Sequence, residues 1–379
     1  MKARIKYICQ YDVQKENAEK RRVFQSGINK ANTIINTLLA LDYGVDIISL
    51  SVALGNDTAP SRFYHFDSNT TLKIFMSFGR GTLFRKVTSY VWHRVQFIWY
   101  CFNNIKKTDK VIIYHTTECP RILYALKKIL GFYMIYEIEE IYADVNGNEK
   151  FRKQEYKLFN VADAYIFPTE KLDKFINTSC KPSVVVYGPY ELRERNDAKE
   201  WGEKIHVVYA GTFEPSKGVL DAINAARFLN EDYCIHILGN GSDIQVKKVK
   251  DTIEDLRRTT QCKVIYEGEK VGEEFYSFMC SCDIGLSPQD PKALYNATSF
   301  PSKVLTYISC GLRVVSIDID TIKSSKVSDK IYFYHDQTPK EIAKTIMSVD
   351  LSREYKYQEI ICELQQDFKK QLEKIMEGK

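Results

Sequence analysis

Short apolar segments alternate with amphipathic segments along most of this chain. Residues 5–9 form the first apolar run, and residues 23–41 follow with apolar side chains three and four positions apart. That period is typical of a helix packed on one face. A second apolar run at 45–50 completes a strand–helix–strand unit, which predicts a parallel sheet.

The alternation continues to residue 187. Buried strands are predicted at 111–115, 133–137, 164–168 and 183–187, with helices at 120–130, 149–159 and 171–176 between them. Strands spaced in this way, with helices between them, indicate a doubly wound sheet. The polar stretch 12–22 is interpreted as a loop, and the stretch 51–110 does not follow the pattern.

The pattern starts again after a charged stretch at 188–204. Strands are predicted at 206–210, 233–238, 264–266, 284–286 and 312–317, with helices at 219–228, 244–257, 274–280, 303–309, 339–347 and 355–376. We therefore predict an α/β protein of GT-B architecture, in which two Rossmann-like, doubly wound domains face a deep cleft. The expected division is an N-terminal, acceptor-side domain at 1–190, a linker at 191–204, a nucleotide-sugar domain at 205–350, and a C-terminal helix at 351–379 that packs back toward the N-terminal domain.

Composition narrows the class of protein. The chain has 379 residues, 44% hydrophobic and 27% charged, as expected for two soluble domains. It shows no signal peptide and no apolar run of membrane-spanning length, so we expect a cytoplasmic location. Its ten cysteines form no CxxC pair, which favours reduced thiols in the core. We expect no nucleic-acid partner, because no stacking module or recognition helix is visible.

The stretch 296–316, NATSFPSKVLTYISCGLRVVS, is the strongest candidate for chemistry. A polar loop at 296–302 leads into an apolar helix at 303–309, which Gly311 ends before a buried strand. The first N–H groups of a helix are unpaired and its dipole favours an anion, so such a corner can hold phosphate. Lys303 adds a positive charge at the same place, and the sequence thus predicts a diphosphate-binding corner.

Five segments then resemble one enzyme family in the family's own order. They are VIIYHTTECPRILYAL, HVVYAGTFEPSKGVLDAINAA, IHILGNGSD, VIYEGEKVGEEFYSFMCSCDIGLSP and SFPSKVLTYISCGLRVVS. Together they resemble the GT-B glycosyltransferases of the large retaining branch called glycosyltransferase family 4. The resemblance implies a hexosyltransferase that takes its sugar, with retention, from a nucleotide-sugar co-substrate, UDP- or GDP-linked. It implies neither a metal nor another cofactor, because lysines and a helix dipole neutralise the diphosphate.

The resemblance also implies roles for particular residues. Lys217 and His115 are the expected catalytic residues, with Lys217 neutralising the leaving group and His115 facing the donor sugar. The expected donor contacts are Gly211, Thr212, Lys217, Gly239, Gly241, Thr298, Ser299, Phe300, Ser302, Lys303 and Thr306. The acceptor side is expected to include Glu137, Glu139 and Glu140. Each has a simpler alternative: a solvated lysine, a glycine in a tight turn, a structural histidine, or a solvated acidic run.

The chain departs from the family pattern at three donor positions. Thr212 stands where the family usually has Arg, and Thr298 and Thr306 stand where it usually has two Glu. Some bacterial polysaccharide-assembly branches carry a SFPSK-type loop instead. We therefore expect transfer to a glycan or lipid-linked acceptor in surface polysaccharide or glycoconjugate biosynthesis. The alternatives are a nucleotide-sugar epimerase on the same fold and a catalytically silent binding subunit.

The segment 75–107 has two interpretations. One is a helix packed in the N-terminal domain, with Trp92, Phe97, Ile98, Trp99, Tyr100 and Phe102 in the core. The other is a docking face for an anionic membrane, which would make the protein peripheral on the inner face of the cell membrane. The charges suit the second interpretation without excluding the first. Residues 60–110 hold nine basic residues, Arg62, Lys73, Arg80, Arg85, Lys86, Arg94, Lys106, Lys107 and Lys110, against Asp67 and Asp109.

Overall fold

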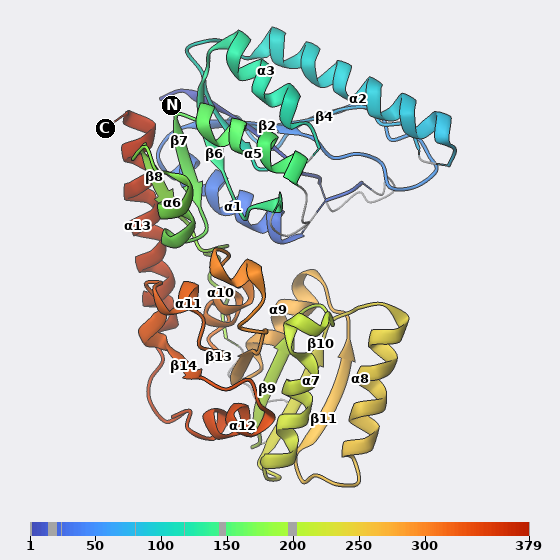
Figure 1. The fold of residues 1–379 in the computed structure, drawn as a ribbon. Helices are drawn as coiled ribbons and strands as arrows, with labels where there is room; N and C mark the ends of the chain where they lie inside the picture. Colours follow the sequence, from blue (N-terminus) through green and yellow to red (C-terminus); the bar gives the residue numbers. More distant parts are fainter. Residues whose placement is uncertain are drawn as a thin grey trace. The chain divides into compact units, whose positions relative to one another are not determined.

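The computed structural model describes residues 2–13, 21–23, 25–79, 81–116, 118–143, 149–195 and 203–378. The chain divides into two compact units, shown in Figure 1. Unit 1 consists of Met1–Pro189 with Gln365–Lys379, and unit 2 is Tyr190–Leu364. Each unit holds a mainly parallel sheet flanked by helices, which confirms the predicted α/β class with two Rossmann-like domains.

Unit 1 is built on an eight-stranded sheet in the order β3-β4-β2-β1-β5-β6-β7-β8. The strands are β1 (Arg4–Cys9), β2 (Gly44–Ser49), β3 (Arg62–His65), β4 (Thr70–Ile74), β5 (Lys110–Tyr114), β6 (Tyr133–Glu137), β7 (Ala164–Phe167) and β8 (Ser183–Val185). Every neighbouring pair is parallel except β3 and β4. Strand order reverses between β1 and β5, which is the topological switch point of this sheet.

Helices cover the unit 1 sheet, and an amphipathic helix keeps its apolar stripe toward such a sheet. They are α1 (Gln25–Ala40), α2 (Leu83–Asn104), α3 (Pro120–Leu130), α5 (Glu149–Val161), α6 (Glu170–Ile176) and the end of α13 (Tyr357–Glu377). In α1 the stripe includes the buried side chains of Ile28, Ala31 and Leu38. The end of α13 is fastened by Lys110, whose Nζ donates a hydrogen bond of 3.4 Å to the carbonyl of Ile375.

Unit 2 has six parallel strands in the order β11-β10-β9-β12-β13-β14. They are β9 (Ile205–Ala210), β10 (Tyr233–Leu238), β11 (Lys263–Gly268), β12 (Ile284–Ser287), β13 (Arg313–Ile317) and β14 (Ile331–Tyr334). The α-helices are α7 (Val219–Asn224), α8 (Asp243–Leu256), α9 (Gly272–Cys280), α10 (Ser302–Ser309), α11 (Asp320–Lys323) and α12 (Pro339–Met347), with 3-10 turns η2 (Pro215–Lys217), η3 (Ala225–Phe228), η4 (Leu294–Ala297) and η5 (Ser328–Lys330). This is the strand order 3-2-1-4-5-6 of a dinucleotide-binding sheet.

Three local features differ from or extend the sequence prediction. The helix predicted at 219–228 continues as the 3-10 turn η3 after Asn224. The stretch 51–110 contributes the strand pair β3 and β4 and then α2, which begins only at Leu83. All ten cysteines are free thiols and eight of them are buried.

The assignment of the α2 aromatics to the core is largely wrong. Phe97 is fully buried, but Trp92, Trp99 and Phe102 are 45%, 68% and 48% exposed. The reason is that α2 touches its unit through a narrow stripe with one residue in every four, comprising Ser89, His93, Phe97 and Cys101. Side chains that flank this stripe, such as Tyr100 against Phe75, still contact unit 1, whereas those on the opposite face of the helix are exposed.

The predicted linker is only partly described. Residues 196–202 lie outside the described residues, as does Arg80 of the basic set. The described part before that gap belongs to unit 2 and is bonded to it by hydrogen bonds and an ion pair. The backbone N–H of Arg193 donates to the carbonyl of Ser309 at 3.1 Å, and the Arg195 guanidinium lies 2.8 Å from the Asp283 carboxylate.

Candidate functional site

The candidate site of unit 2 lies where its strand order reverses. Strands β9 and β12 are neighbours, and the chain leaves them at Gly211 and Pro288. Ligands of open α/β sheets bind beyond the carboxyl ends of the strands at this point. The loop that precedes α10 is fastened here by the buried side chain of Asn296, whose Nδ2 donates to the carbonyl of Asp290 at 2.6 Å and whose Oδ1 accepts from Gln289 at 2.9 Å.

Lys303, in the first turn of α10, supplies the most unusual group of the site. Its Nζ is buried and has no hydrogen-bond partner among the described residues. The amine lies over the ring of Tyr209, 4.3 Å from the ring centroid. Burial, together with a smaller contribution from repulsion by the nearby Lys217, lowers the pKa of Lys303 from 10.5 to about 7. Burying a cation without a partner costs free energy, and a bound anion would offset that cost. We therefore interpret the Lys303 amine as an anion-binding group.

Two glycines allow close approaches at this corner, and the first of them lies next to the Lys303 amine. A Cβ on Gly211 would lie 3.2 Å from the Lys303 Nζ, and the φ of +154° at Gly211 disfavours any other residue. Gly239 follows β10 with φ +137°, and a Cβ there would lie only 1.8 Å from the carbonyl oxygen of Gly211. The turns after β9 and β10 therefore touch through backbone atoms. The predicted Gly241 lies in the second of these turns, two residues after Gly239.

The amino end of α10 adds further donors. Pro301 occupies the N-cap position and no side chain caps the helix. The Ser299 Oγ is buried and, among the described residues, has no hydrogen-bond partner. An anion at this end would thus meet uncapped backbone N–H groups, a hydroxyl and the Lys303 amine together.

The other predicted donor residues surround this corner in different environments. Phe300 is buried, Thr298 and Thr306 are half-buried, and Thr212 and Ser302 are exposed. The Thr306 hydroxyl donates to the carbonyl of Ser302 at 3.3 Å, within its own helix. Lys217 ends the turn η2 and is half-buried. Contact of these side chains with a donor remains a prediction.

Two tyrosines support the site and were missed by the sequence reasoning. The Tyr307 hydroxyl accepts a hydrogen bond from the N–H of Ala210 and donates one to the carbonyl of Leu286, both at 3.0 Å. It thereby joins the carboxyl ends of β9 and β12 across the switch point. The Tyr209 hydroxyl donates to the carbonyl of Thr212 at 2.7 Å, which holds the turn that carries Gly211. Both residues look like ordinary core aromatics in the sequence.

The acidic run of unit 1 forms a buried cluster at the carboxyl ends of β1 and β6. Glu137 is fully buried and accepts a hydrogen bond of 2.5 Å from the Tyr7 hydroxyl. Lys30 lies 4.0 Å from Glu137 and 2.5 Å from Glu139. Burial raises the pKa of Glu137 to about 8, against the attraction of Lys30 and with a further contribution from the Glu139 charge. Glu139 and Glu140 are half-buried.

His115 follows β5 and is buried inside unit 1. Its Nε2 lies 3.0 Å from the carboxylate of Glu155, which also accepts the N–H of Tyr142 at 2.8 Å. The imidazole packs against the rings of Tyr136 and Tyr142. These contacts match the structural alternative for His115, and its catalytic role stays a prediction.

The described residues include one cluster with metal-ligand chemistry, formed by the buried His206, Cys234 and His236. Three of its four ring nitrogens take part in hydrogen bonds within the protein. The His206 Nδ1 lies 2.9 Å from the His236 Nε2, and the His236 Nδ1 lies 2.8 Å from Glu267. The cluster begins at the second residue of β9 and of β10, whereas the candidate site lies beyond their other ends. It therefore takes no part in the site.

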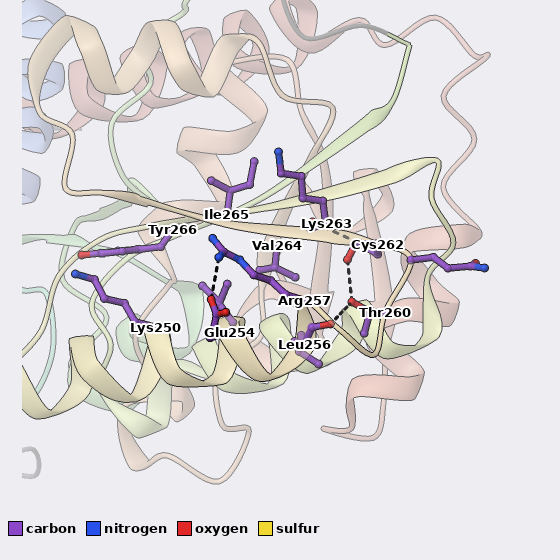
Figure 2. A pocket seen from close by; sticks show the side chains of 12 residues that line it. Lys250, Glu254, Leu256, Arg257, Thr260, Cys262, Lys263, Val264, Ile265 and Tyr266 are labelled. Carbon is purple, nitrogen blue, oxygen red and sulfur yellow. Dashed lines mark hydrogen bonds and ion pairs between the residues drawn. The ribbon is translucent and has the colours of Figure 1, made fainter.

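A separate groove of about 650 Å³ runs between α8 and the edge strand β11. Figure 2 shows its lining, in which Arg257 pairs with Glu254 at 2.9 Å and Thr260 bonds the backbone at the turn between helix and strand. None of the predicted site residues lines this groove. We therefore do not assign the active site to this groove, although its volume is large.

Most of unit 2 resembles a known protein family. Residues 204–349 match the family model described as glycosyl transferases group 1. No curated protein sequence matched the chain.

Solved structures of similar fold cover the chain nearly from end to end. A Burkholderia xenovorans α,α-trehalose-phosphate synthase (UDP-forming) in complex with glucose-6-phosphate has 9% identity and a TM-score of 0.67, covering 99% of both chains. Anabaena Alr3699/HepE in complex with UDP and glucose has 11% identity and a TM-score of 0.65, covering 98% of this chain and 99% of its own. Sucrose-phosphate synthase from Thermosynechococcus elongatus has 11% identity and a TM-score of 0.61, covering 98% and 94%. The chain thus has the GT-B fold, and its residues 204–349 are similar to the glycosyl transferases group 1 family.

Proposed function

We propose that this protein is a glycosyltransferase that moves a hexose from a UDP- or GDP-linked donor to a glycan or lipid-linked acceptor. The observation that carries the proposal is the Lys303 amine, which is buried, has no hydrogen-bond partner among the described residues and lies at an uncapped helix start. The diphosphate of a nucleotide sugar would supply the missing negative charge. The match of residues 204–349 to glycosyl transferases group 1 supports the same class of donor.

The proposed chemistry is cleavage of the bond between the anomeric carbon and the diphosphate oxygen. The diphosphate takes the electron pair, and negative charge develops on its terminal phosphate. Lys303, Lys217 and the first N–H groups of α10 would stabilise that charge where it forms. In this proposal two lysines and a helix start take the place of a metal ion. The acceptor oxygen bonds to the anomeric carbon and its proton passes to the departing diphosphate, and the resemblance implies that the new glycosidic bond retains the anomeric configuration.

The donor contacts are proposed to differ from those of the usual family member. Thr298 and Thr306 offer hydroxyls where two carboxylates are expected, and Thr212 replaces an arginine. Hydroxyls form weaker hydrogen bonds than carboxylates to the hydroxyl groups of a sugar or ribose. More of the donor affinity would then come from the diphosphate corner.

On the acceptor side, Glu137 and Glu139 are proposed to contact a sugar hydroxyl. Both belong to the cluster at the carboxyl ends of β1 and β6, and Glu139 is the more accessible of the two. The SFPSK loop supports a role in surface polysaccharide assembly, with the protein acting on the cytoplasmic side of the membrane.

Turnover of a panel of UDP- and GDP-sugars tests the proposal. Free nucleotide and sugar are followed by NMR, with glycan, lipid-linked and phosphorylated sugars offered as acceptors. We expect nucleoside diphosphate release with a new glycoside, and at least a hundredfold lower rate for Lys217→Ala. A sugar that is epimerised while still attached to its nucleotide would indicate the epimerase instead. Failure to bind any nucleotide would indicate a silent subunit.

A further inference from the structure

Helix α2 carries an unusual amount of exposed apolar surface. Nine large apolar side chains on this helix are exposed, with fractions from 45% for Trp92 to 78% for Leu83. We call these nine side chains the outer face of α2. It includes Phe84, Val91, Val95, Trp99 and Phe102, which recur at helical spacing along the whole length of α2.

This arrangement reverses the usual pattern of a surface helix. The buried stripe of α2 contains a serine, a histidine and a cysteine beside Phe97, while the outer face contains valines and aromatics. Surface helices normally keep their apolar side chains toward the core and polar ones toward solvent. Large exposed apolar patches generally mark sites of interaction with a protein or a membrane.

The charges on and next to α2 indicate which kind of partner its outer face binds. Helix α2 contains Arg85, Lys86 and Arg94 and no Asp or Glu. Arg85 and Lys86 are exposed at its amino end, and Lys106 and Lys107 are exposed just beyond its carboxyl end. A second copy of the same face would bring these like charges together at the contact. An anionic lipid surface would instead complement them while its acyl chains received the apolar side chains.

We propose that the outer face of α2 docks on an anionic lipid bilayer as an interfacial helix. None of the described helices is long and apolar enough to cross a membrane, so the contact would be peripheral. Figure 1 shows α2 on the outside of unit 1, reaching past α3. Trp92 and Trp99 suit the boundary between headgroups and acyl chains, because an indole has an apolar ring and a polar N–H.

Vesicle binding of the full chain tests the proposal. Vesicles of phosphatidylcholine with 30% phosphatidylglycerol are compared with pure phosphatidylcholine, by co-sedimentation at low and at physiological salt. We expect binding to the anionic vesicles only, weakened by salt. Phe84→Ser/Trp99→Ser should lower the partition coefficient at least tenfold. Phe175→Ser is the matched control, because it removes a side chain of unit 1 that is 56% exposed on another helix.

A second variant separates charge from apolar contact. Arg85→Ala/Lys86→Ala should lower binding about twenty-five-fold at low salt and flatten its salt dependence, since each basic residue near the surface raises binding about fivefold. Circular dichroism confirms that each variant is folded. Brominated acyl chains should also quench the tryptophan emission, because two of the three tryptophans lie on the outer face.

Three results would overturn the proposal. The first is no binding of the folded wild type to anionic vesicles at low salt. The second is an equal loss of binding in Phe175→Ser. The third is a dimer in solution that Phe84→Ser/Trp99→Ser converts to monomer without any change in vesicle binding, which would assign the outer face to a second copy. These measurements need no nucleotide, so they stand apart from the test of the transferase activity.

Discussion

Replacing Lys303 by Met should stabilise the protein and abolish its nucleotide binding. The native amine is buried beside the Tyr209 ring without a hydrogen-bond partner among the described residues. A lowering of its pKa from 10.5 to about 7 corresponds to a cost of about 5 kcal/mol for keeping the charged form folded below pH 7. Met has a similar length, carries no charge, and its sulfur packs well against an aromatic ring.

Relaxation and water around the amine reduce this cost, so we expect a gain of about 2 kcal/mol at neutral pH. For a unit of this size that is a rise of about 4–8 °C in the thermal midpoint. The gain depends on pH in a defined direction. Between pH 7 and 10.5 the folded wild type binds fewer protons than the unfolded chain, so its stability rises with pH. Lys303→Met removes that slope.

The assay is differential scanning calorimetry with and without UDP, GDP or inorganic pyrophosphate. Wild type should be stabilised by at least one of these anions, and Lys303→Met by none, with affinity at least a hundredfold lower, or about 3 kcal/mol. Lys217→Met is the control, because Lys217 is half-buried and its loss should weaken binding with little change in the midpoint. A lower midpoint for Lys303→Met, or unchanged binding of all three anions, would refute the reasoning.

Three other substitutions test the anion-binding corner, the switch point of unit 2 and the buried acidic cluster of unit 1. Gly211→Ala should weaken pyrophosphate binding about tenfold in calorimetric titration, because its Cβ would lie 3.2 Å from the Lys303 amine; equal affinity would contradict the proposed crowding. Tyr307→Phe should cost about 2 kcal/mol in urea unfolding, because two buried backbone groups at the switch point lose their partner; a change below 0.5 kcal/mol would show that they find another. Glu137→Gln should flatten the pH dependence of thermal stability between pH 4.5 and 8. The wild type is expected to lose stability as pH rises through this window, because burial raises the pKa of Glu137 to about 8; a pH profile shared by both proteins would contradict this.

The fold could be predicted because its strands are buried on both faces. All five residues of β13 and all four of β12 are buried, so each strand appears in the sequence as a continuous apolar run. Because amphipathic helices lie between such runs, the sequence predicts a parallel, doubly wound sheet. The pair β3 and β4 escaped this reasoning because β3 is mostly exposed and antiparallel.

The exposure of α2 could not be predicted in the same way. Its sequence has apolar residues on several faces, and periodicity does not say which face the unit covers. That choice depends on the contacts of Phe97 with Phe75 and of α2 with α3, which come from distant segments. The basic residues around the helix were the only sequence signal of an exposed face.

For the candidate site, the sequence predicted which residues lie at the start of the helix, but not how deeply they are buried or which side chains surround them. Lys303 was recognised from its position at the start of a helix. Its burial and lowered pKa depend on Tyr209, Gly211 and Lys217, about 90 residues earlier in the chain. The pairing of His115 with Glu155, 40 residues later, was equally hidden.

The most direct test of the account is a calorimetric titration of UDP and GDP at pH 8, in two buffers of different ionisation enthalpy. If the free Lys303 amine has a pKa of about 7 and the diphosphate restores its charge, each bound nucleotide should take up about 0.9 proton. The same titration of Lys303→Met should show neither tight binding nor proton uptake. Tight binding to the wild type without proton uptake would contradict the account, and so would the absence of any binding.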